Sequence, residues 1–389
     1  MAAVQAAAVQ GASITIIFKS TGAAAGKTFR RTRVNFGQTT KKRILKMTEA
    51  TPKTVDDLER CLSRPTDRAV EAMGRMRGDL VILGVGGKMG PTLARMARRA
   101  SDAAGVQRRI WGVSRFTSGS TRERLEANGV ETIACDLLDE QAVARLPDAA
   151  NVLFMTGMKF GAAANPGLAW AMNCYAPAVV SRRYADSKLV AFSTGNVYGL
   201  TPVAGGGSVE SDPPRPDGEY AMMALGRERM FQYFSVAQGT SVALLRLNYA
   251  TELRYGVLVD LARQVFQGEP VDVSMGYVNV IWLADANAMT LAAFDQMASP
   301  ARIINLAGSE VLGLRAVATR FGELFGRDVR CVGHESSDAL LNNGHGGYPL
   351  LGEPAVSAET MMRWTAEWIA SGGESLGKPT HFQVRNGKF

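Results

Sequence analysis

The stretch DLVILGVGGKMGP, residues 79–91, places an apolar run directly before a group of glycines and a proline, and an amphipathic stretch follows it. A dinucleotide-binding loop needs this order. A tight turn must leave the strand, the backbone must approach a pyrophosphate closely, and the next helix must pack on the sheet. Glycine meets all three needs because it has no Cβ. The alternative is a glycine-rich turn that binds nothing. The residues predicted to contact the dinucleotide here are Gly84, Gly87, Lys88, Met89 and Gly90.

The end of the predicted second strand indicates which dinucleotide is bound. This strand, 108–113, is followed by Ser114 and Arg115 and not by Asp or Glu. An acid at this position binds a free ribose 2′-hydroxyl, whereas a base suits a 2′-phosphate. The planar guanidinium of Arg115 therefore favours NADP, with NAD and an ordinary surface arginine as the alternatives. After the third strand, Asp136 is placed to accept a hydrogen bond from the adenine amino group.

Short apolar runs alternate with amphipathic stretches from residue 79 onward. Runs of this kind are typical of parallel strands that are buried on both faces. The pattern predicts an α/β fold, a doubly wound parallel sheet of Rossmann type with a smaller C-terminal substrate lobe. The predicted strands are 80–83, 110–113, 152–155, 189–192 and 242–245. The predicted domains are a basic leader (1–46), a helical lead-in (47–78), an NAD(P)-binding Rossmann domain (79–250), and a mixed α/β substrate lobe with C-terminal helices (251–389).

The net charge of +8 comes from the first 46 residues, which carry five Lys and four Arg but no Asp or Glu. The remaining residues hold 35 basic against 36 acidic side chains, so the basic composition does not argue for a nucleic-acid partner. The leader has three interpretations: a reading frame that truly starts at Met47, an organellar transit peptide, or a surface arm. We expect residues 1–46 to be disordered or not native.

The spacing of the cysteines and histidines indicates neither a metal site nor a disulfide framework. The four cysteines form no CxxC motif and the three histidines share no ligand spacing, so no metal site is predicted. Scattered thiols indicate a reducing compartment and a cytoplasmic protein, or an organellar one if the leader is a transit peptide. No apolar run reaches the roughly 18 residues of a membrane span. The predicted partner is a small-molecule substrate, with no nucleic acid and no membrane, and a homodimer is open.

Several stretches together resemble the extended short-chain dehydrogenase/reductase family, which contains the NAD-dependent nucleotide-sugar epimerases and dehydratases. The three loop glycines match its GxxGxxG spacing. The stretch VLFMTGMK (152–159) is similar to its fourth strand and the loop beside the cofactor, and VAFSTGNVYG (190–199) is similar to its fifth-strand motif. VIWLAD (280–285) and INLAG (304–308) are similar to later landmarks, so the likeness covers about residues 79–330. The further cofactor contacts that it implies are Ser114, Asp136, Leu137, Thr156, Gly157, Lys159 and Asn173.

The resemblance also implies a catalytic pair. Thr194 stands three residues before Val197 in the fifth-strand motif, and Tyr220 follows at the start of a predicted helix. A tyrosine phenol ordinarily titrates near pH 10, so a nearby cation must favour its ionised form before it can act as a base at neutral pH. The family supplies a lysine four residues later, one turn along the same helix face. Here that position is Ala224.

Lys159 and Arg227 are the two candidates to replace the missing lysine. With either of them, the resemblance implies an NAD(P)-dependent oxidoreductase, epimerase or dehydratase that acts on a hydroxyl or carbonyl of a small polar substrate, such as a sugar derivative. Thr194 would hydrogen-bond the reacting oxygen and Tyr220 would exchange its proton. The alternative is a non-catalytic NAD(P)-binding regulator or redox sensor. A nucleic-acid binder that uses the basic leader is a third hypothesis.

Overall fold

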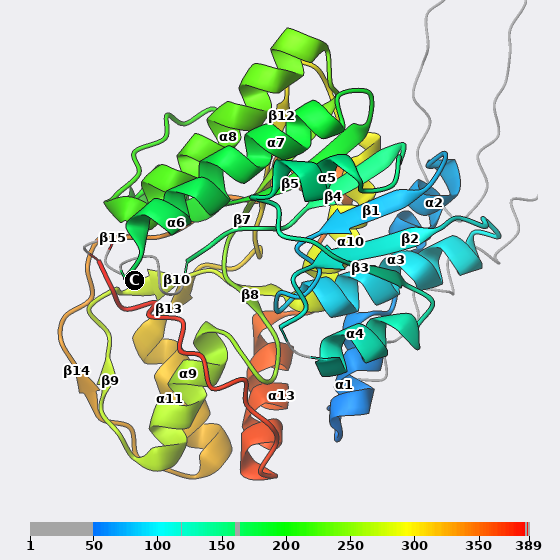
Figure 1. Cartoon of the computed structure of the whole chain (residues 1–389). Helices are drawn as coiled ribbons and strands as arrows, with labels where there is room; N and C mark the ends of the chain where they lie inside the picture. The colour runs from blue at the N-terminus through cyan, green and yellow to red at the C-terminus, as the bar shows by residue number, and fades with distance from the viewer. Residues whose placement is uncertain (1–49, 118, 160–163, 386, 388–389) are drawn as a thin grey trace, which may run out of the picture. The chain divides into compact units, whose positions relative to one another are not determined.

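Seven parallel strands form the central sheet in a computed structural model that describes residues 50–117, 119–159, 164–385 and 387 (Figure 1). The strand order is β12-β7-β5-β4-β1-β2-β3, and every neighbouring pair is parallel. Chain order reverses between β1 and β4, where ligands bind in sheets of this kind. The predicted doubly wound parallel sheet is thus confirmed. The strands are β1 (Leu80–Leu83), β2 (Ile110–Ser114), β3 (Glu131–Ala134), β4 (Asn151–Phe154), β5 (Lys188–Thr194), β7 (Val242–Leu247) and β12 (Arg302–Leu306).

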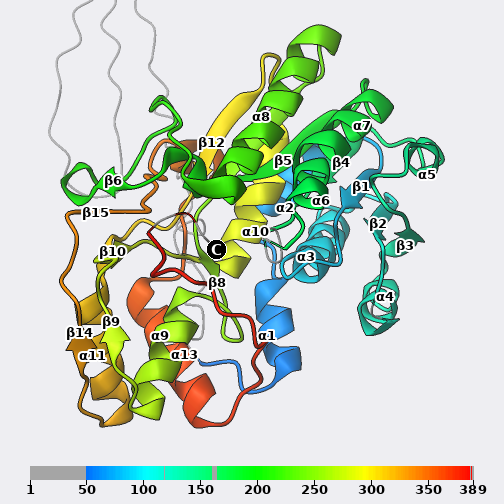
Figure 2. The same ribbon diagram turned by 60° about the vertical axis from the view of Figure 1, so that its left-hand side comes forward.

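Helices cover both faces of the sheet because its apolar side chains alternate between them. In β1, Leu80 and Ile82 pack into the core on one face, and Val81 and Leu83 into the core on the other. Helices α2, α3 and α10 contribute to the first core, and α5, α7 and α8 to the second (Figures 1 and 2). Their bounds, with those of α4, are α2 (Asp67–Arg75), α3 (Gly90–Ala103), α4 (Gly119–Glu126), α5 (Glu140–Ala144), α7 (Ala176–Arg183), α8 (Gly218–Gln238) and α10 (Leu283–Ala292).

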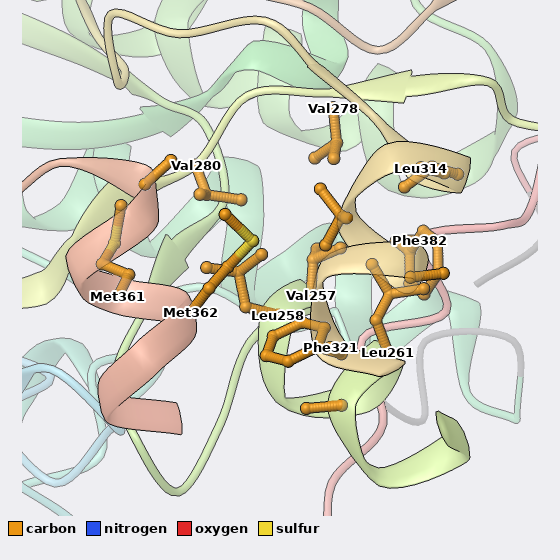
Figure 3. Packing of buried hydrophobic residues seen from close by; sticks show 14 of the residues in the cluster. Val257, Leu258, Leu261, Val278, Val280, Leu314, Phe321, Met361, Met362 and Phe382 are labelled. Atoms are coloured by element: carbon orange, nitrogen blue, oxygen red, sulfur yellow. The ribbon is translucent and has the colours of Figure 1, made fainter. Parts of the chain in front are cut away.

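A second lobe packs around its own hydrophobic core. Figure 3 shows side chains of α9, α11 and α13 meeting there, among them Leu258, Phe321 and Met362. Helix α1 adds Leu58 and Leu62 to the same core. The helices of this lobe are α1 (Val55–Leu62), α9 (Val257–Gln267), α11 (Leu314–Phe325) and α13 (Ala358–Ala370). Helix α12 (Tyr348–Leu351) packs instead in the first core, on the Rossmann sheet. Short strands pair as β6 (Thr201–Pro202) with β15 (Asp338–Ala339), β8 (Ala250–Thr251) with β11 (Ile281–Trp282), β9 (Val271–Asp272) with β14 (Cys331–Val332), and β10 (Tyr277–Val278) with β13 (Leu312–Gly313).

The two lobes are interleaved along the chain. Strand β12 and helix α10 belong to the Rossmann sheet and its cover, although they fall within the 251–389 segment predicted for the substrate lobe. The helical lead-in is likewise shared, because α1 packs in the second lobe and α2 on the sheet. One compact unit, Thr51–Phe389, holds both lobes. The predicted basic leader, residues 1–46, lies outside the described residues.

Other features of the described chain bear on function. All four cysteines are free thiols. The described residues contain no group of three or more His, Cys, Asp or Glu side chains that could hold a metal ion. In the same part of the chain, no helix combines the length and apolar character needed to cross a bilayer.

Candidate active site

A cavity of about 350 Å³ lies at the carboxyl ends of the sheet strands, and residues of both lobes line it. The Rossmann side contributes the glycine-rich loop, the segment after β4, the end of β5 and the start of α8. The second lobe contributes the residues around the start of α9 and one C-terminal residue, Thr380. The sequence-predicted residues that line the cavity are Gly84, Gly87, Lys88, Met89, Gly90, Gly157, Lys159, Thr194, Tyr220 and Arg227.

The loop between β1 and α3 requires glycine at two positions for different reasons. Gly84 has φ +89°, and a Cβ there would lie 2.5 Å from the Thr156 hydroxyl oxygen. Gly90 lies so close to the preceding turn that a Cβ would come within 2.1 Å of the Val85 carbonyl oxygen. At Gly87 a Cβ would meet one atom, the Gly84 carbonyl oxygen, at 3.5 Å. Gly84 thus permits the tight turn, Gly90 permits the close packing of the helix, and Gly87 leaves space for a dinucleotide to approach the backbone.

We expect Gly90→Ala and Gly87→Ala to affect different properties. The Gly90 methyl group would collide with backbone, so Gly90→Ala should lower the free energy of unfolding by about 1–3 kcal/mol or more. Gly87→Ala should change that free energy by no more than about 0.5 kcal/mol, because its methyl group makes an ordinary contact. It should nevertheless weaken dinucleotide binding, since Gly87 lines the cavity. Urea unfolding of both variants measures the change in stability, and NAD titration measures the change in dinucleotide affinity. Equal losses of stability in the two variants would contradict the expected difference.

The residues around the loop fit a bound dinucleotide. Helix α3 has Pro91 in its first turn and Met89 as its N-cap, without a side-chain capping bond, so its first N–H groups can face phosphates. The Thr156 hydroxyl is buried beside Gly84 and has no hydrogen-bond partner among the described residues. A buried hydroxyl without a partner is costly unless a ligand supplies one. These groups could hold the phosphates and the adjoining ribose.

The predicted adenosine-side residues lie outside the cavity, at the ends of β2 and β3. Ser114 ends β2 and packs against the loop, because a Cβ on Gly86 would lie 2.5 Å from its hydroxyl. Arg115 follows it and is exposed. Asp136 follows β3 and accepts a hydrogen bond from the Leu138 N–H at 3.1 Å, while Leu137 is buried in the core. Their contacts with the cofactor stay predictions.

Thr194 is the last residue of β5 and caps the short 3₁₀ helix η2 (Gly195–Tyr198). Its hydroxyl accepts a hydrogen bond from the Asn196 N–H at 3.3 Å and lines the cavity. The preceding hydroxyl, on Ser193, instead donates to the buried Glu228 carboxylate at 2.6 Å. The Ser193 hydroxyl is engaged by a carboxylate, whereas the Thr194 hydroxyl makes no hydrogen bond to a carboxylate among the described residues and lines the cavity. Thr194 is therefore the better candidate to bind a substrate oxygen.

Tyr220 lies in the first turn of α8 and its half-buried ring faces the same cavity. One turn later, Ala224 occupies the position where the family resemblance implies a lysine. Its side chain is fully buried and packs against Val197 and Tyr198. A cation beside the phenol must therefore come from another position in the chain.

Lys159, in the segment after β4, supplies such a cation. Its ammonium nitrogen lies 5.4 Å from the centroid of the Tyr220 ring. Burial lowers the pKa of Lys159 to about 8, so it still carries its charge at neutral pH. The fourth-strand loop thus brings a positive charge to the phenol, as one of the two sequence hypotheses expected.

Arg227, the second candidate, lies two turns along α8 from Tyr220 and is buried. Its guanidinium donates to the Phe192 carbonyl at 2.9 Å and to the Asn173 side-chain carbonyl, and its Nε has no partner among the described residues. Burial lowers the pKa of Arg227, and the negative charge that Tyr220 carries when ionised opposes that shift. The guanidinium is thus part of the cavity wall and interacts electrostatically with the phenol when the phenol is ionised.

Asn173 holds Arg227 in place. It lies in a π-helical turn, η1 (Ala171–Tyr175), between α6 (Pro166–Trp170) and α7. Its side-chain amide donates to the Ala169 and Met158 carbonyls at 2.8 and 3.1 Å. Asn173 does not line the cavity among the described residues, and its predicted cofactor contact stays a prediction.

For the second-lobe side of the cavity, the sequence indicated only that residues 249–285 would contribute to the substrate pocket, with no role for a particular residue. Tyr249, Glu252 and Tyr255 line it, and Thr380 reaches it from the C-terminal segment. Burial raises the pKa of both Tyr249 and Tyr255, so these two phenols stay neutral. No motif marks these residues in the sequence. The positive φ of Tyr249 (+39°), uncommon for a residue with a side chain, is visible only in the structure.

Residues 80–272, from β1 to β9, match the model of the NAD dependent epimerase/dehydratase family over about half of the chain. This part of the chain is similar to that family. The match spans the glycine-rich loop, Thr194 and Tyr220, and it ends in the second lobe. No curated protein matches the chain.

Solved structures share the fold of this chain. UDP-glucose 4-epimerase from Thermotoga maritima, solved with UDP-glucose, is 17% identical and superposes with a TM-score of 0.62 over 76% of this chain and 99% of its own. UDP-glucuronic acid 4-epimerase from Bacillus cereus, with UDP-glucuronic acid and NAD, is 16% identical with a TM-score of 0.63, over 75% and 99%. The Thermus thermophilus UDP-glucose 4-epimerase complex with NAD is 20% identical with a TM-score of 0.60, over 74% and 98%. At these identities the likeness concerns the fold.

Proposed function

We propose that this protein is an NAD(P)-dependent enzyme that epimerises, dehydrates or reduces a small polar substrate at a hydroxyl or carbonyl, with a sugar derivative as the expected class. The observation that carries the proposal is the position of the Lys159 ammonium, 5.4 Å from the Tyr220 ring centroid. It shares its cavity with Thr194 and the glycine-rich loop. These are the groups required for proton exchange at an oxygen whose carbon exchanges a hydride with a nicotinamide.

Each residue has a role in this proposal. The Thr194 hydroxyl hydrogen-bonds the reacting oxygen and orients it. Tyr220 exchanges a proton with that oxygen, and the cations of Lys159 and Arg227 line the same cavity. Tyr249 and Tyr255 stay protonated and shape the wall, because burial raises the pKa of both. The lysine function of the family is thereby divided between two cations that reach the phenol from different elements.

The glycine-rich loop, the start of α3 and Thr156 would hold the cofactor, which supplies a hydride acceptor or donor when bound. We propose NADP as the preferred form, with NAD as the alternative. Support comes from Arg115, which is exposed directly after β2, where a 2′-phosphate would lie in this fold. The three solved relatives described above include complexes with NAD, which makes NAD the necessary comparison.

The competing hypothesis is a non-catalytic NAD(P)-binding regulator, and one experiment separates the two. The purified protein is titrated with NADP and with NAD. The loaded protein is then mixed with a panel of nucleotide sugars and free sugars, and absorbance is followed at the reduced-nicotinamide band. An enzyme is expected to bind one dinucleotide and to change absorbance with at least one panel member. Binding without any change across the panel would favour the regulator.

A further inference from the structure

The chain after α13 returns across the second lobe to the active-site cavity. Residues 374–385 and 387 form this C-terminal strap, which runs from the end of α13 past α9 (Figure 1). The Thr380 N–H and hydroxyl both donate to the Asp260 carboxylate in α9, at 2.8 and 2.6 Å. Thr380 also lines the cavity that Tyr220 faces. The strap is therefore part of the cavity wall and is tied to the helix beside it.

Two further contacts anchor the strap to the second lobe. The Phe382 side chain is buried in the core of that lobe (Figure 3). The Arg385 guanidinium donates to the Asp338 carbonyl at 2.9 Å and forms an ion pair with the carboxylate of the same residue. A buried aromatic ring and an arginine with two acceptors hold a segment in one place. The end of the strap thus has a fixed position.

The end of the strap packs against the start of the helix that carries Tyr220. A Cβ on Gly218 would lie 2.3 Å from the Gly387 carbonyl oxygen, and a Cβ on Gly387 would lie 2.6 Å from the Asp217 carbonyl oxygen. Both glycines have a positive φ, +77° and +65°, which residues with a side chain rarely adopt. The two backbones therefore touch where only glycine fits. Asp217, the N-cap of α8, makes no side-chain capping bond, so this packing is one of the contacts that fix the helix start.

The strap also faces the segment that follows Thr194. A small cavity of about 10 Å³ is lined by Asn196 and Gly199, in and directly after η2, and by Val384 and Arg385 of the strap. This volume has room for about one water molecule at most, so the strap and η2 are close neighbours. The strap thus lies against both elements that carry the proposed catalytic pair.

We infer that the C-terminal strap is a positioning element of the active site, which holds the first turn of α8, and with it Tyr220, at the cavity. Gly387 and Arg385 are its positioning residues, and Thr380 closes the adjoining wall. The role of Tyr220 rests on the function proposed above. Displacing a reacting group by about 1 Å can lower a rate about a hundredfold, so loosening the strap should slow the reaction. Dinucleotide affinity should be unchanged, because the glycine-rich loop and α3 belong to the other lobe.

The first variant loosens the strap at its anchor. Arg385→Met removes the guanidinium that binds Asp338. Its matched control is Arg75→Met, which removes another partly exposed arginine–aspartate pair, with Asp295 at 2.6 Å. Neither residue of the control pair is among the described residues that line the cavity. The comparison therefore separates the loss of the strap anchor from the loss of a surface ion pair.

The second variant loosens the contact from the side of α8. Gly218→Ala pushes a methyl group into the Gly387 backbone. Its control is Gly239→Ala, at the other end of α8, where φ is +74° and nothing lies within 4 Å of the added carbon. Because the two glycines have nearly the same φ, both variants carry similar backbone strain, and only Gly218→Ala collides with the strap.

Amide hydrogen exchange of the full chain, read by mass spectrometry, is the deciding measurement. We expect Arg385→Met to speed exchange in residues 219–224 at least about tenfold, and Gly218→Ala to speed exchange in residues 376–385 to the same extent. The two controls should leave both segments unchanged. The inference is overturned if either variant affects only its own segment, because the strap would then be no more than a structural part of the second lobe.

The second measurement is the rate of hydride transfer with the substrate that the sugar panel identifies. Arg385→Met should be at least about tenfold slower, Arg385→Lys should recover part of the rate, and NAD affinity should stay within about twofold in both. Faster exchange in α8 without a slower reaction would overturn the positioning role. The two proposals fail separately: an unchanged rate in Tyr220→Phe would contradict the proposed function, and the exchange result would still decide whether the strap holds α8.

Discussion

Tyr220→Phe is expected to lower the rate of hydride transfer by about 10²- to 10⁴-fold, the usual contribution of a positioned general acid or base. The substitution removes one hydroxyl from a half-buried ring, so the fold and the affinity for the dinucleotide should be preserved. The rate is measured as the absorbance change of the bound nicotinamide, with the substrate that the sugar panel identifies.

The matched control is Tyr233→Phe, because Tyr233 lies on the same helix and is 62% exposed, away from the cavity. Its rate should equal that of the unaltered protein. If Tyr220→Phe also transferred hydride at the original rate, Tyr220 would have no role in proton transfer, and the non-catalytic alternative or a different base would be favoured.

A large loss of stability is expected when the buried ion pair between β7 and α8 is broken. Arg246 of β7 and Glu228 of α8 are 1% and 0% exposed, and the Arg246 guanidinium donates to both carboxylate oxygens at 2.9 and 2.7 Å. Glu228→Gln leaves the arginine charge buried without its counter-charge. We expect a loss of about 3–5 kcal/mol in the free energy of unfolding, measured by urea denaturation.

Two comparisons isolate the buried charge as the cause. Glu359→Gln breaks an exposed pair with Arg320 and should shift the urea midpoint little, because exposed pairs contribute little. Replacing Glu228 and Arg246 together by Met removes both charges and should recover much of the lost stability. A double variant no more stable than Glu228→Gln would show that the pair does not act through its charges. Glu228 also binds Ser193 beside Thr194, so its loss should disturb the catalytic end of β5.

The sheet could be predicted from the sequence because its strands are buried on both faces. The predicted runs 80–83 and 110–113 lie within β1 and β2, and 189–192 and 242–245 lie within β5 and β7. Continuous apolar runs mark such strands directly. Strand β12 was not predicted, because it returns to the sheet from the far end of the chain, and such a long-range pairing has no local pattern.

The site was predictable where a motif fixes the backbone and unpredictable where side chains meet across lobes. Gly84, Gly90, Thr194 and Tyr220 follow from spacing, and the structure places them around one cavity or its floor. The side chain of Lys88 lies over Tyr255, 167 positions later in the chain, and this contact depends on how the lobes pack. The position of the buried Arg227 in the cavity wall depends in the same way on its contact with Asn173.

In the proposed function, Tyr220 acts without a lysine at position 224 because Lys159 brings a positive charge to it. The most direct test is the single-turnover rate of hydride transfer between about pH 6 and 10 for the original protein, Lys159→Arg and Lys159→Met. Burial lowers the pKa of Lys159 to about 8, so the original rate should fall as the pH rises through that value and the charge is lost. Lys159→Arg keeps its charge and should show no such fall, and Lys159→Met should be at least about tenfold slower below pH 8. A Lys159→Met protein with the original rate and pH profile would contradict the claim.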